Sequence, residues 1–134
     1  LLVSKVINTK KSSSKNFVIV DAGMTDLLRP PLYSAYHSIK EVFHTDANKT
    51  LCDVVGPVCE TADFIGKDRN LSLSKGDYIA VECVGAYGFA LSSNYNTRLK
   101  SAEYLITKDS RDIKKIRDRD TIEQILENEI KYLL

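Results

Sequence analysis

The sequence has no long apolar run, no excess of charge of either sign and no signal-like start. No stretch approaches the roughly 20 apolar residues that a membrane-spanning helix needs. The 134 residues carry a net charge of +1, so no strong field favours nucleic acid or an anionic membrane as a partner. The first residues lack a basic segment, a small-residue cleavage site and an initiator Met. We therefore expect no signal peptide, and we expect the chain to be a piece of a longer protein.

Cysteine is scarce and irregularly placed. The chain holds Cys52, Cys59 and Cys83, an odd number without regular spacing, which argues against a disulfide framework. A Cys-x-x-Cys pair and a Cys/His ligand set are both missing, so no zinc site is expected. A reducing, cytosolic setting fits this usage best. Cys52 and Cys83 fall within strand-like runs, where a packed core cysteine is the favoured interpretation.

Composition and length predict one globular domain of mainly β structure. Hydrophobic residues make up 43% and charged residues 28%, both ordinary values. Short runs rich in β-favouring residues alternate with irregular, turn-forming segments. This pattern predicts an antiparallel, Greek-key-like barrel or sandwich with a C-terminal helix. The expected strands are residues 1–8, 17–20, 51–59, 78–84 and 102–107, the first two forming a hairpin.

The segments between these strands give weaker predictions. Residues 24–39 are expected to be irregular, because Pro30 and Pro31 restrict the residues before them. Residues 41–49 are polar and predict an exposed loop, and the charged residues 108–119 predict a solvated linker. Asp120 and Glu123 resemble a capping box, so a helix is expected to follow. Its apolar face would comprise Ile122, Ile125, Leu126, Ile130 and Leu133.

The most informative stretch is residues 56–63, Gly-Pro-Val-Cys-Glu-Thr-Ala-Asp. An apolar run leads into it, and Gly56-Pro57 then interrupts the strand. A thiol and two carboxylates follow within five positions. Reactive groups on a loop at a strand end are a common design for a functional site. Taken alone, Cys59 beside Glu60 would more often be a buried cysteine next to a surface acid.

Three composite motifs change that balance, because together they resemble a known enzyme family. The first motif comprises Asp21-Ala22-Gly23-Met24, Arg29-Pro30-Pro31-Leu32-Tyr33 and Tyr36-His37. The second motif is residues 56–63. The third motif comprises Gly85-Ala86-Tyr87-Gly88-Phe89 and Ser93-Asn94-Tyr95-Asn96. In this order and spacing they resemble the C-terminal domain of the diaminopimelate decarboxylases. These are pyridoxal-phosphate enzymes of the alanine-racemase-like fold type, also called fold type III. The resemblance runs from Val3 to the strand around Leu105.

The resemblance implies a second domain, a cofactor and a partner. The family's N-terminal half is a (β/α)₈ TIM barrel that holds pyridoxal 5'-phosphate through a lysine. This chain contains no lysine in a context that suggests such a link, so alone it is expected to bind the cofactor weakly and to be inactive. Active sites in this fold type lie at a homodimer interface. Cys59 and Glu60 are therefore expected to reach the partner's site.

The resemblance also implies roles for five side chains. Cys59 is the expected catalytic proton donor, returning a proton to the α-carbon after carbon dioxide leaves. Arg29 suits the distal carboxylate of meso-diaminopimelate, because guanidinium binds carboxylate in a bidentate way. Tyr33 can donate to the same carboxylate, and Glu60 suits the distal ammonium. Tyr87, between two glycines, can approach the cofactor phosphate or the substrate.

Plainer interpretations remain open for each of these residues. Cys59 could be a core cysteine, Arg29 a surface residue, and Tyr33 and Tyr87 aromatic residues of the core. His37 and Asp63 are expected to be structural, and the turn at residues 94–96 to shape the pocket without reacting.

Two departures and two rival functions accompany the resemblance. Residues 97–100 replace an Arg-Pro that the family often has, and Thr61-Ala62 replaces the commoner Ser-Gly. Related enzymes acting on ornithine, arginine or carboxynorspermidine are the first rival, although they typically carry Cys-Asp where this chain has Cys59-Glu60. The second rival is a non-catalytic homologue that binds or regulates an active decarboxylase.

Overall fold

The computed structural model describes residues 1–43, 48–107 and 112–133. The chain divides into two compact units, Leu1–Ser92 and Ser93–Leu134. The first unit carries all five predicted site residues.

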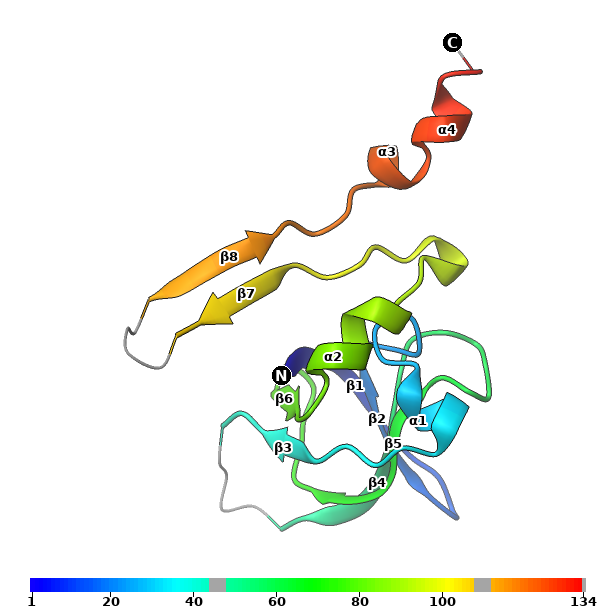
Figure 1. The fold of residues 1–134 in the computed structure, drawn as a ribbon. Coiled ribbons are helices and arrows are strands. Elements are labelled where there is room, and N and C mark those ends of the chain that lie inside the picture. Colours follow the sequence, from blue (N-terminus) through cyan, green and yellow to red (C-terminus); the bar gives the residue numbers. More distant parts are fainter. Residues whose placement is uncertain (44–47, 108–111, 134) are drawn as a thin grey trace. The chain divides into compact units, whose positions relative to one another are not determined.

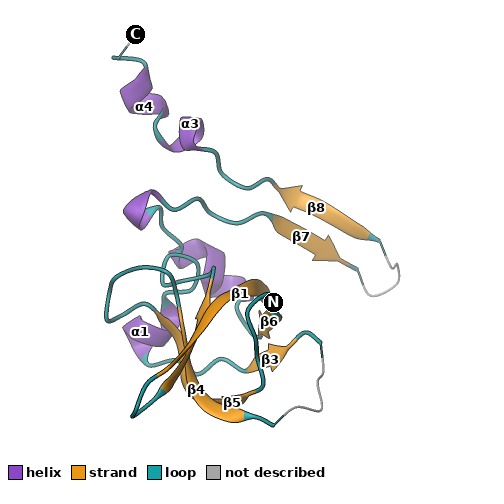
Figure 2. Cartoon of the chain, turned by 180° about the vertical axis from the view of Figure 1, so that it is seen from behind, coloured by secondary structure: helices purple, strands orange, loops and turns teal. Residues whose placement is uncertain are grey.

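The first unit is built on a six-stranded sheet that curves into a barrel-like form (Figures 1 and 2). Its strand order is β3-β6-β1-β2-β4-β5, and β3 also packs against β5, which brings the two edges of the sheet together. All pairs are antiparallel except β2 and β4. The strands are β1 (Leu2–Lys11), β2 (Asn16–Val20), β3 (Ile39–Glu41), β4 (Thr50–Val55), β5 (Phe64–Leu71) and β6 (Tyr78–Val81).

Small and branched apolar side chains form the core that this curved sheet encloses. Inward residues alternate with exposed ones along the strands, as the two-residue period of a half-buried strand requires. In β1, for example, Ser4 and Val6 are buried while Val3, Lys5 and Ile7 are exposed. The fully buried apolar residues include Val6, Val20, Leu27, Val54, Ile65, Ile79 and Val81.

The predicted β architecture and the β1–β2 hairpin are confirmed, with corrections at the strand ends. β1 continues to Lys11, and the hairpin loop closes through a 2.9 Å hydrogen bond from the Ser12 N–H to the Lys15 carbonyl. β4 ends at Val55, so residues 56–59 are not strand. β5 extends through residues expected to be loop, and β3 begins where irregular chain was expected.

Short helices occupy two of the strand connections. α1 (Arg29–Tyr33) follows β2, and α2 (Gly85–Gly88) follows β6 and leads into η1 (Phe89–Leu91). The expectation of irregular chain around Pro30 was wrong at α1. Proline is tolerated in the first turn of a helix, where its missing N–H would have no intrahelical partner. Ser34, with a φ of 53°, ends the helix in the left-handed region.

The second unit consists of a turn, a two-stranded hairpin and two helical turns. Its elements are η2 (Tyr95–Thr97), β7 (Glu103–Ile106), β8 (Ile113–Arg117), α3 (Ile122–Ile125) and α4 (Glu127–Ile130). β8 lies within the stretch expected to be a linker, so that prediction was wrong for its described part. The single terminal helix was also wrong, since it is interrupted at Leu126. The capping box is shifted by one residue, with Thr121 as N-cap and Gln124 reaching back.

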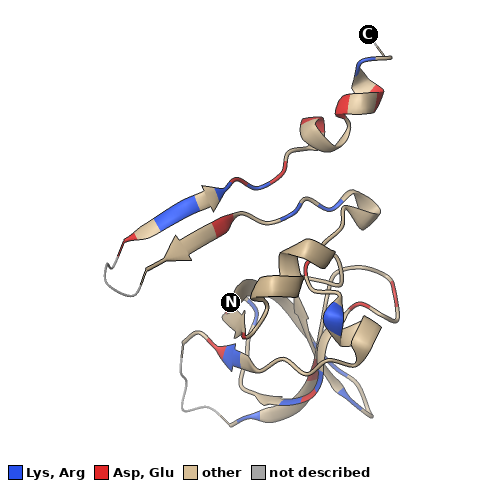
Figure 3. Ribbon diagram, in the orientation of Figure 1, with Lys and Arg blue, Asp and Glu red and all other residues tan. Residues whose placement is uncertain are grey.

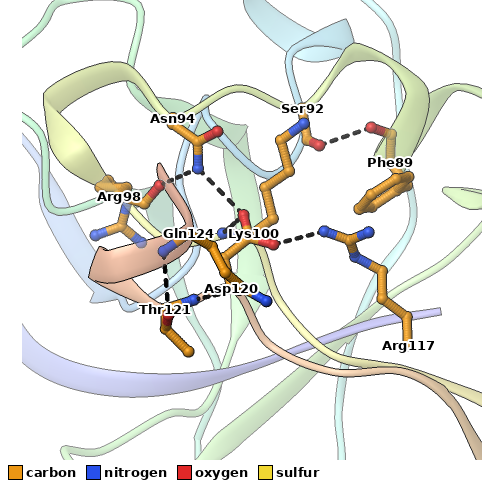
Figure 4. A network of polar contacts seen from close by, with 9 residues as sticks. All are labelled: Phe89, Ser92, Asn94, Arg98, Lys100, Arg117, Asp120, Thr121 and Gln124. Atoms are coloured by element: carbon orange, nitrogen blue, oxygen red, sulfur yellow. Dashed lines mark hydrogen bonds and ion pairs between the residues drawn. The ribbon is translucent and has the colours of Figure 1, made fainter. Parts of the chain in front are cut away.

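Asp120 connects the two sides of the second unit (Figure 4). Its Oδ2 accepts from the Asn94 side chain at 3.2 Å and from the Lys100 N–H at 3.1 Å. Its Oδ1 accepts from Arg117 at 2.6 Å. The backbone N–H of Asp120 donates to the Lys100 carbonyl at 3.1 Å. The segments before β7 and after β8 are thereby held together.

Charge and hydropathy are spread without large blocks in the described residues. Lys and Arg alternate with Asp and Glu along the segment around β8 (Figure 3). No helix in the described ranges combines the length and the apolar character needed to cross a membrane.

Candidate functional site

The predicted site residues lie on two connections between strands of the first unit and on the segment after its last strand. Arg29 and Tyr33 lie on α1, between β2 and β3. Cys59 and Glu60 lie on residues 56–63, between β4 and β5, which we name the Cys59 loop. Tyr87 lies on α2, after β6. Each position follows a buried strand, so the sheet fixes the starting point of every segment.

Asp63 holds the Cys59 loop against the segment that leads to α1. The residue is only 3% exposed. The Met24 N–H donates to its Oδ1 at 2.6 Å, and the Val58 N–H donates to its Oδ2 at 2.5 Å. A Cβ on Gly23 or Gly56 would overlap the same carboxylate, so both glycines are needed for the close approach. The structural role predicted for Asp63 is confirmed.

Backbone hydrogen bonds add to this connection within the Cys59 loop. The Gly56 N–H donates to the Asp63 carbonyl at 2.9 Å, and the Asp63 N–H donates to the Glu60 carbonyl at 3.0 Å. Asp63 therefore fixes both ends of the segment that presents Cys59 and Glu60. Charged acceptors of backbone N–H groups are among the stronger hydrogen bonds in proteins.

A second anchor fixes the start of the segment that carries Arg29. Ser4, 3% exposed on β1, donates to Oδ1 of Asp21 at 2.6 Å and accepts from the Ala22 N–H at 2.9 Å. The Gly23 N–H donates to Oδ2 of Asp26 at 2.9 Å. Sequence reasoning missed Ser4, because nothing in its local sequence indicates a partner 17 residues away.

Arg29 and Tyr87 come together although 58 residues separate them in the sequence. The guanidinium carbon lies 5.8 Å from the centre of the Tyr87 ring, within the range of a cation–π contact. Nη1 of Arg29 also lies 3.5 Å from Nε2 of His37. His37 is 1% exposed, and its Nδ1 lies 2.9 Å from the Glu82 carbonyl. The structural role predicted for His37 is confirmed.

The side chains predicted to act on the substrate are accessible. Cys59 and Glu60 are exposed, and Tyr33 and Tyr87 are 64% and 62% exposed. A core position is therefore excluded for Cys59 and for both tyrosines in the first unit. Tyr33 follows Arg29 by four residues on the same helix, which places both on one face.

The other two cysteines differ from each other. Cys52 is 1% exposed in β4, as predicted, and its thiol donates to the Arg69 carbonyl at 3.4 Å. Burial and the nearby charge of Asp53 raise the pKa of the Cys52 thiol. Cys83 is exposed, so the prediction of a core cysteine was wrong there. It lies at the corner after β6 with a φ of 58°.

The residues present fit a supporting contribution to a pyridoxal-phosphate site. The Tyr87 phenol is exposed, and a Cβ on the neighbouring Gly85 would meet no atom within 4 Å, so a phosphate can approach this backbone. No lysine in the described ranges is buried, and several form surface ion pairs. Within those ranges, the Tyr87 phenol could donate a hydrogen bond to the cofactor, and no buried lysine is present to hold it.

The predicted site is an open surface of this unit. A hollow in the described structure is lined by residues 12–16 and Leu51, at the tip of the β1–β2 hairpin. It shares no residue with the predicted site. The half-buried guanidinium of Arg29 and the exposed carboxylate, thiol and phenol groups could bind a small zwitterion and transfer a proton, provided that another surface closes over them.

Comparison with known proteins identifies the class to which this unit belongs. Residues 1–85 match the model of the pyridoxal-dependent decarboxylase C-terminal sheet domain. The chain therefore belongs to this family, whose members depend on pyridoxal, and the resemblance proposed from the sequence motifs is confirmed.

The individual relatives are diaminopimelate decarboxylases. The chain is 49% identical to the Haemophilus influenzae enzyme over 126 residues, covering 93% of the chain and 30% of that enzyme. It is 45% identical over 132 residues to the enzyme of Neisseria meningitidis serogroup B, covering 98% of the chain and 31% of the enzyme. The chain thus spans about a third of the length of the curated relatives it matches.

Solved structures support the same fold. A crystal structure of Helicobacter pylori diaminopimelate decarboxylase with L-lysine matches with a TM-score of 0.88 at 45% identity, covering 98% of this chain and 32% of that one. A lysine decarboxylase from Selenomonas ruminantium matches with a TM-score of 0.63 at 24% identity, which shows the fold alone.

Proposed function

We propose that residues 1–134 form the C-terminal domain of a diaminopimelate decarboxylase, which converts meso-2,6-diaminopimelate to L-lysine and carbon dioxide in lysine biosynthesis. Its N-terminal domain would be a TIM barrel that binds most of the pyridoxal 5'-phosphate. The observation that carries the proposal is the meeting of the half-buried Arg29 and the exposed Tyr87, with the guanidinium carbon 5.8 Å from the ring centre. The names of the relatives support the substrate assignment.

Substrate recognition is assigned to charged groups on two segments. Arg29 binds the distal carboxylate in a bidentate way, and Tyr33 donates a further hydrogen bond to it. Glu60 accepts from the distal ammonium. This pairing of one cation with one anion matches a substrate end that carries both charges. Ornithine has no distal carboxylate for Arg29 to hold, so the pairing favours diaminopimelate.

The chemical step is assigned to Cys59. The bound cofactor supplies an electron sink for loss of the α-carboxylate. Cys59 then donates its thiol proton to the α-carbon and recovers a proton from solvent, to which it is exposed. Tyr87 donates a hydrogen bond to the cofactor phosphate or the substrate.

The proposal includes an obligate homodimer in the cytoplasm. Cys59 and Glu60 would reach the active site of the partner subunit, so each site would need both chains. The exposure of the Cys59 loop in the isolated chain is compatible with such an arrangement.

A fusion of this chain to the barrel half of the Haemophilus influenzae enzyme tests the proposal. We expect the fusion to release L-lysine and carbon dioxide from meso-diaminopimelate, and the barrel half alone to release neither. A folded, cofactor-loaded fusion without lysine formation would contradict the proposal. Putrescine release from ornithine would favour a related decarboxylase. Altered activity of a complete decarboxylase upon addition of the chain would favour a non-catalytic partner.

A further inference from the structure

His37 is a buried side chain that contacts Arg29 and has no part in the proposed chemical step. Its ring lies between the guanidinium of Arg29 on α1 and the backbone of Glu82 at the end of β6. Only 1% of the residue is exposed, so these partners replace water almost completely. A buried polar ring with two specific partners is costly to lose, because each partner would also lose its hydrogen bond.

The partners determine which ring nitrogen carries the proton. A carbonyl oxygen can only accept, so Nδ1 must donate to Glu82 at 2.9 Å. Arg29 can only donate, so Nε2 must accept from Nη1 at 3.5 Å. A neutral imidazole with its hydrogen on Nδ1 satisfies both contacts. The Glu82 carbonyl thereby orients the ring, and the ring offers a fixed acceptor to the guanidinium.

We propose that His37 is a positioning residue for substrate selection: it holds Arg29 at the angle at which the guanidinium can bind the distal carboxylate. The proposal rests on the function proposed above. Among the residues that the structure describes, His37 accepts from Arg29, whose guanidinium lies near the Tyr87 ring, and a guanidinium has further N–H groups that can donate to a ligand. Because Glu82 is three residues before α2, the same contact connects Arg29 to the segment that carries Tyr87.

Two substitutions separate the two contacts of the ring. His37→Asn places an amide nitrogen near the position of Nδ1, so it can still donate to Glu82 but cannot reach Arg29. His37→Gln places an amide oxygen near the position of Nε2, so it can accept from Arg29 but loses the bond to Glu82. We therefore expect the Asn variant to keep its melting temperature and lose carboxylate selectivity. The Gln variant should lose melting temperature and keep selectivity.

The test measures dissociation constants by calorimetry on the intact enzyme, with two ligands. D-2-aminopimelate has the distal carboxylate without the distal amine, and D-lysine has the distal amine without the distal carboxylate. In His37→Asn we expect the dissociation constant of D-2-aminopimelate to rise about tenfold and that of D-lysine to stay within about twofold. In an Arg29→Ala background, His37→Asn should have no further effect on the binding of D-2-aminopimelate.

The outcomes separate this inference from the proposed function. If Arg29→Ala leaves the binding of D-2-aminopimelate unchanged, the assignment of Arg29 to the distal carboxylate fails. If Arg29→Ala weakens it and His37→Asn does not, only the role of His37 fails. Equal losses for both ligands in both His37 variants, or failure of both variants to fold, would likewise contradict the positioning role, because each substitution retains one hydrogen bond.

Discussion

At the scale of single residues, the two cysteines flanking Gly56 have opposite environments. Cys59 is exposed on its loop, whereas Cys52 is buried. The Cys52 thiol donates to the Arg69 carbonyl, and burial raises the pKa of this thiol. A buried thiol without solvent contact cannot readily recover a proton. The difference makes Cys52 a matched control for the proton donor assigned above.

Replacing Cys59 with Ala should slow the intact enzyme without emptying its active site. We expect kcat for lysine formation to fall about 100-fold or more, since positioned general acids typically contribute 10²–10⁴-fold. Cofactor absorbance and substrate binding should be retained. Cys52→Ala should leave kcat near that of the wild type and lower the melting temperature. Wild-type turnover by the Cys59 variant would remove this thiol from the mechanism.

Asp63 gives a second prediction at this scale. In the wild type, the backbone N–H groups of Met24 and Val58 each donate to one carboxylate oxygen of Asp63. In Asp63→Asn, the amide N–H₂ replaces one of these oxygens, so one backbone N–H loses its acceptor. We expect a loss of about 1–3 kcal/mol in the free energy of unfolding, the usual cost of a buried donor left unpaired. The intact enzyme should also lose kcat, because the Cys59 loop is no longer fixed.

Asp77 provides the matched control for Asp63. Its Oδ2 accepts from the Ser74 N–H at 2.7 Å in the turn before β6, away from the Cys59 loop. Asp77→Asn should therefore reduce stability and leave kcat unchanged. Equal kcat values for the two variants would show that Asp63 acts on the fold alone. Chemical denaturation and steady-state kinetics supply the two readouts.

At the scale of structural elements, the Cys59 loop depends on a close approach that only glycine permits. A Cβ on Gly56 would overlap the Asp63 carboxylate, which its hydrogen bonds prevent from moving aside. We expect Gly56→Ala to destabilise the first unit by about 1–3 kcal/mol, the range for overpacked interiors. Gly85→Ala, where the new Cβ meets no atom within 4 Å, should be tolerated in thermal denaturation. Equal melting temperatures for the two variants would contradict this account.

The hairpin of β7 and β8 depends on Asp120, and this gives a pH prediction. Burial raises the pKa of Asp120, but hydrogen bonds from Asn94 and Lys100 and the charge of Arg117 outweigh burial and hold it below 3.8. A carboxyl whose pKa is lower in the folded state stabilises that state above the unfolded pKa, and the contribution disappears as pH falls through the folded pKa.

Asp120→Asn should therefore destabilise the second unit by about 1–2 kcal/mol at pH 7 and have little effect below its folded pKa. Hydrogen exchange at the β7–β8 amides, followed from pH 7 down through the folded pKa of Asp120, measures this. A difference between wild type and variant that persists unchanged at the lowest pH would show that the charge of Asp120 is not the cause. Asp118→Asn is the control, since Asp118 forms only an exposed ion pair with Lys115.

Elements defined by local sequence could be predicted, and those defined by distant contacts could not. The strands expected from residues 17 and 78 onward follow from runs of β-favouring residues, although the second ends at Val81 and not at residue 84 as expected. The strand expected to continue to residue 59 ends at Val55, because Gly56-Pro57 stops the regular pairing. The parallel pairing of β2 with β4 has no local signature. The sequence does not predict β8, because its many charged residues are typical of a solvated linker. It does not predict α1, because two prolines favour irregular chain unless they fall in the first turn of a helix.

The same division applies to the candidate site. The three composite motifs identified Arg29, Cys59 and Tyr87, because their residue types and order are specific. The contacts that orient these side chains come from residues that look unremarkable in the sequence. Ser4 lies in an ordinary strand, and the buried contact of His37 with Glu82 spans 45 positions.

At the scale of the whole molecule, the first unit presents a set of exposed reactive groups held by buried anchors. Asp63 fixes the loop of Cys59 and Glu60, and His37 contacts Arg29 beside Tyr87. This arrangement suits a surface that completes a site formed with another domain. The family match and the coverage of about a third of each relative agree with such a role.

A crystal structure of the intact enzyme with bound L-lysine would test the central claim most directly. Our account predicts that one lysine molecule is contacted by Glu60, by Tyr33 or Arg29, and by Tyr87, contributed by one or both protomers. The Cys59 thiol should face Cε of this lysine, the carbon that lost the carboxylate. A lysine bound with these side chains directed to other surfaces would contradict the account.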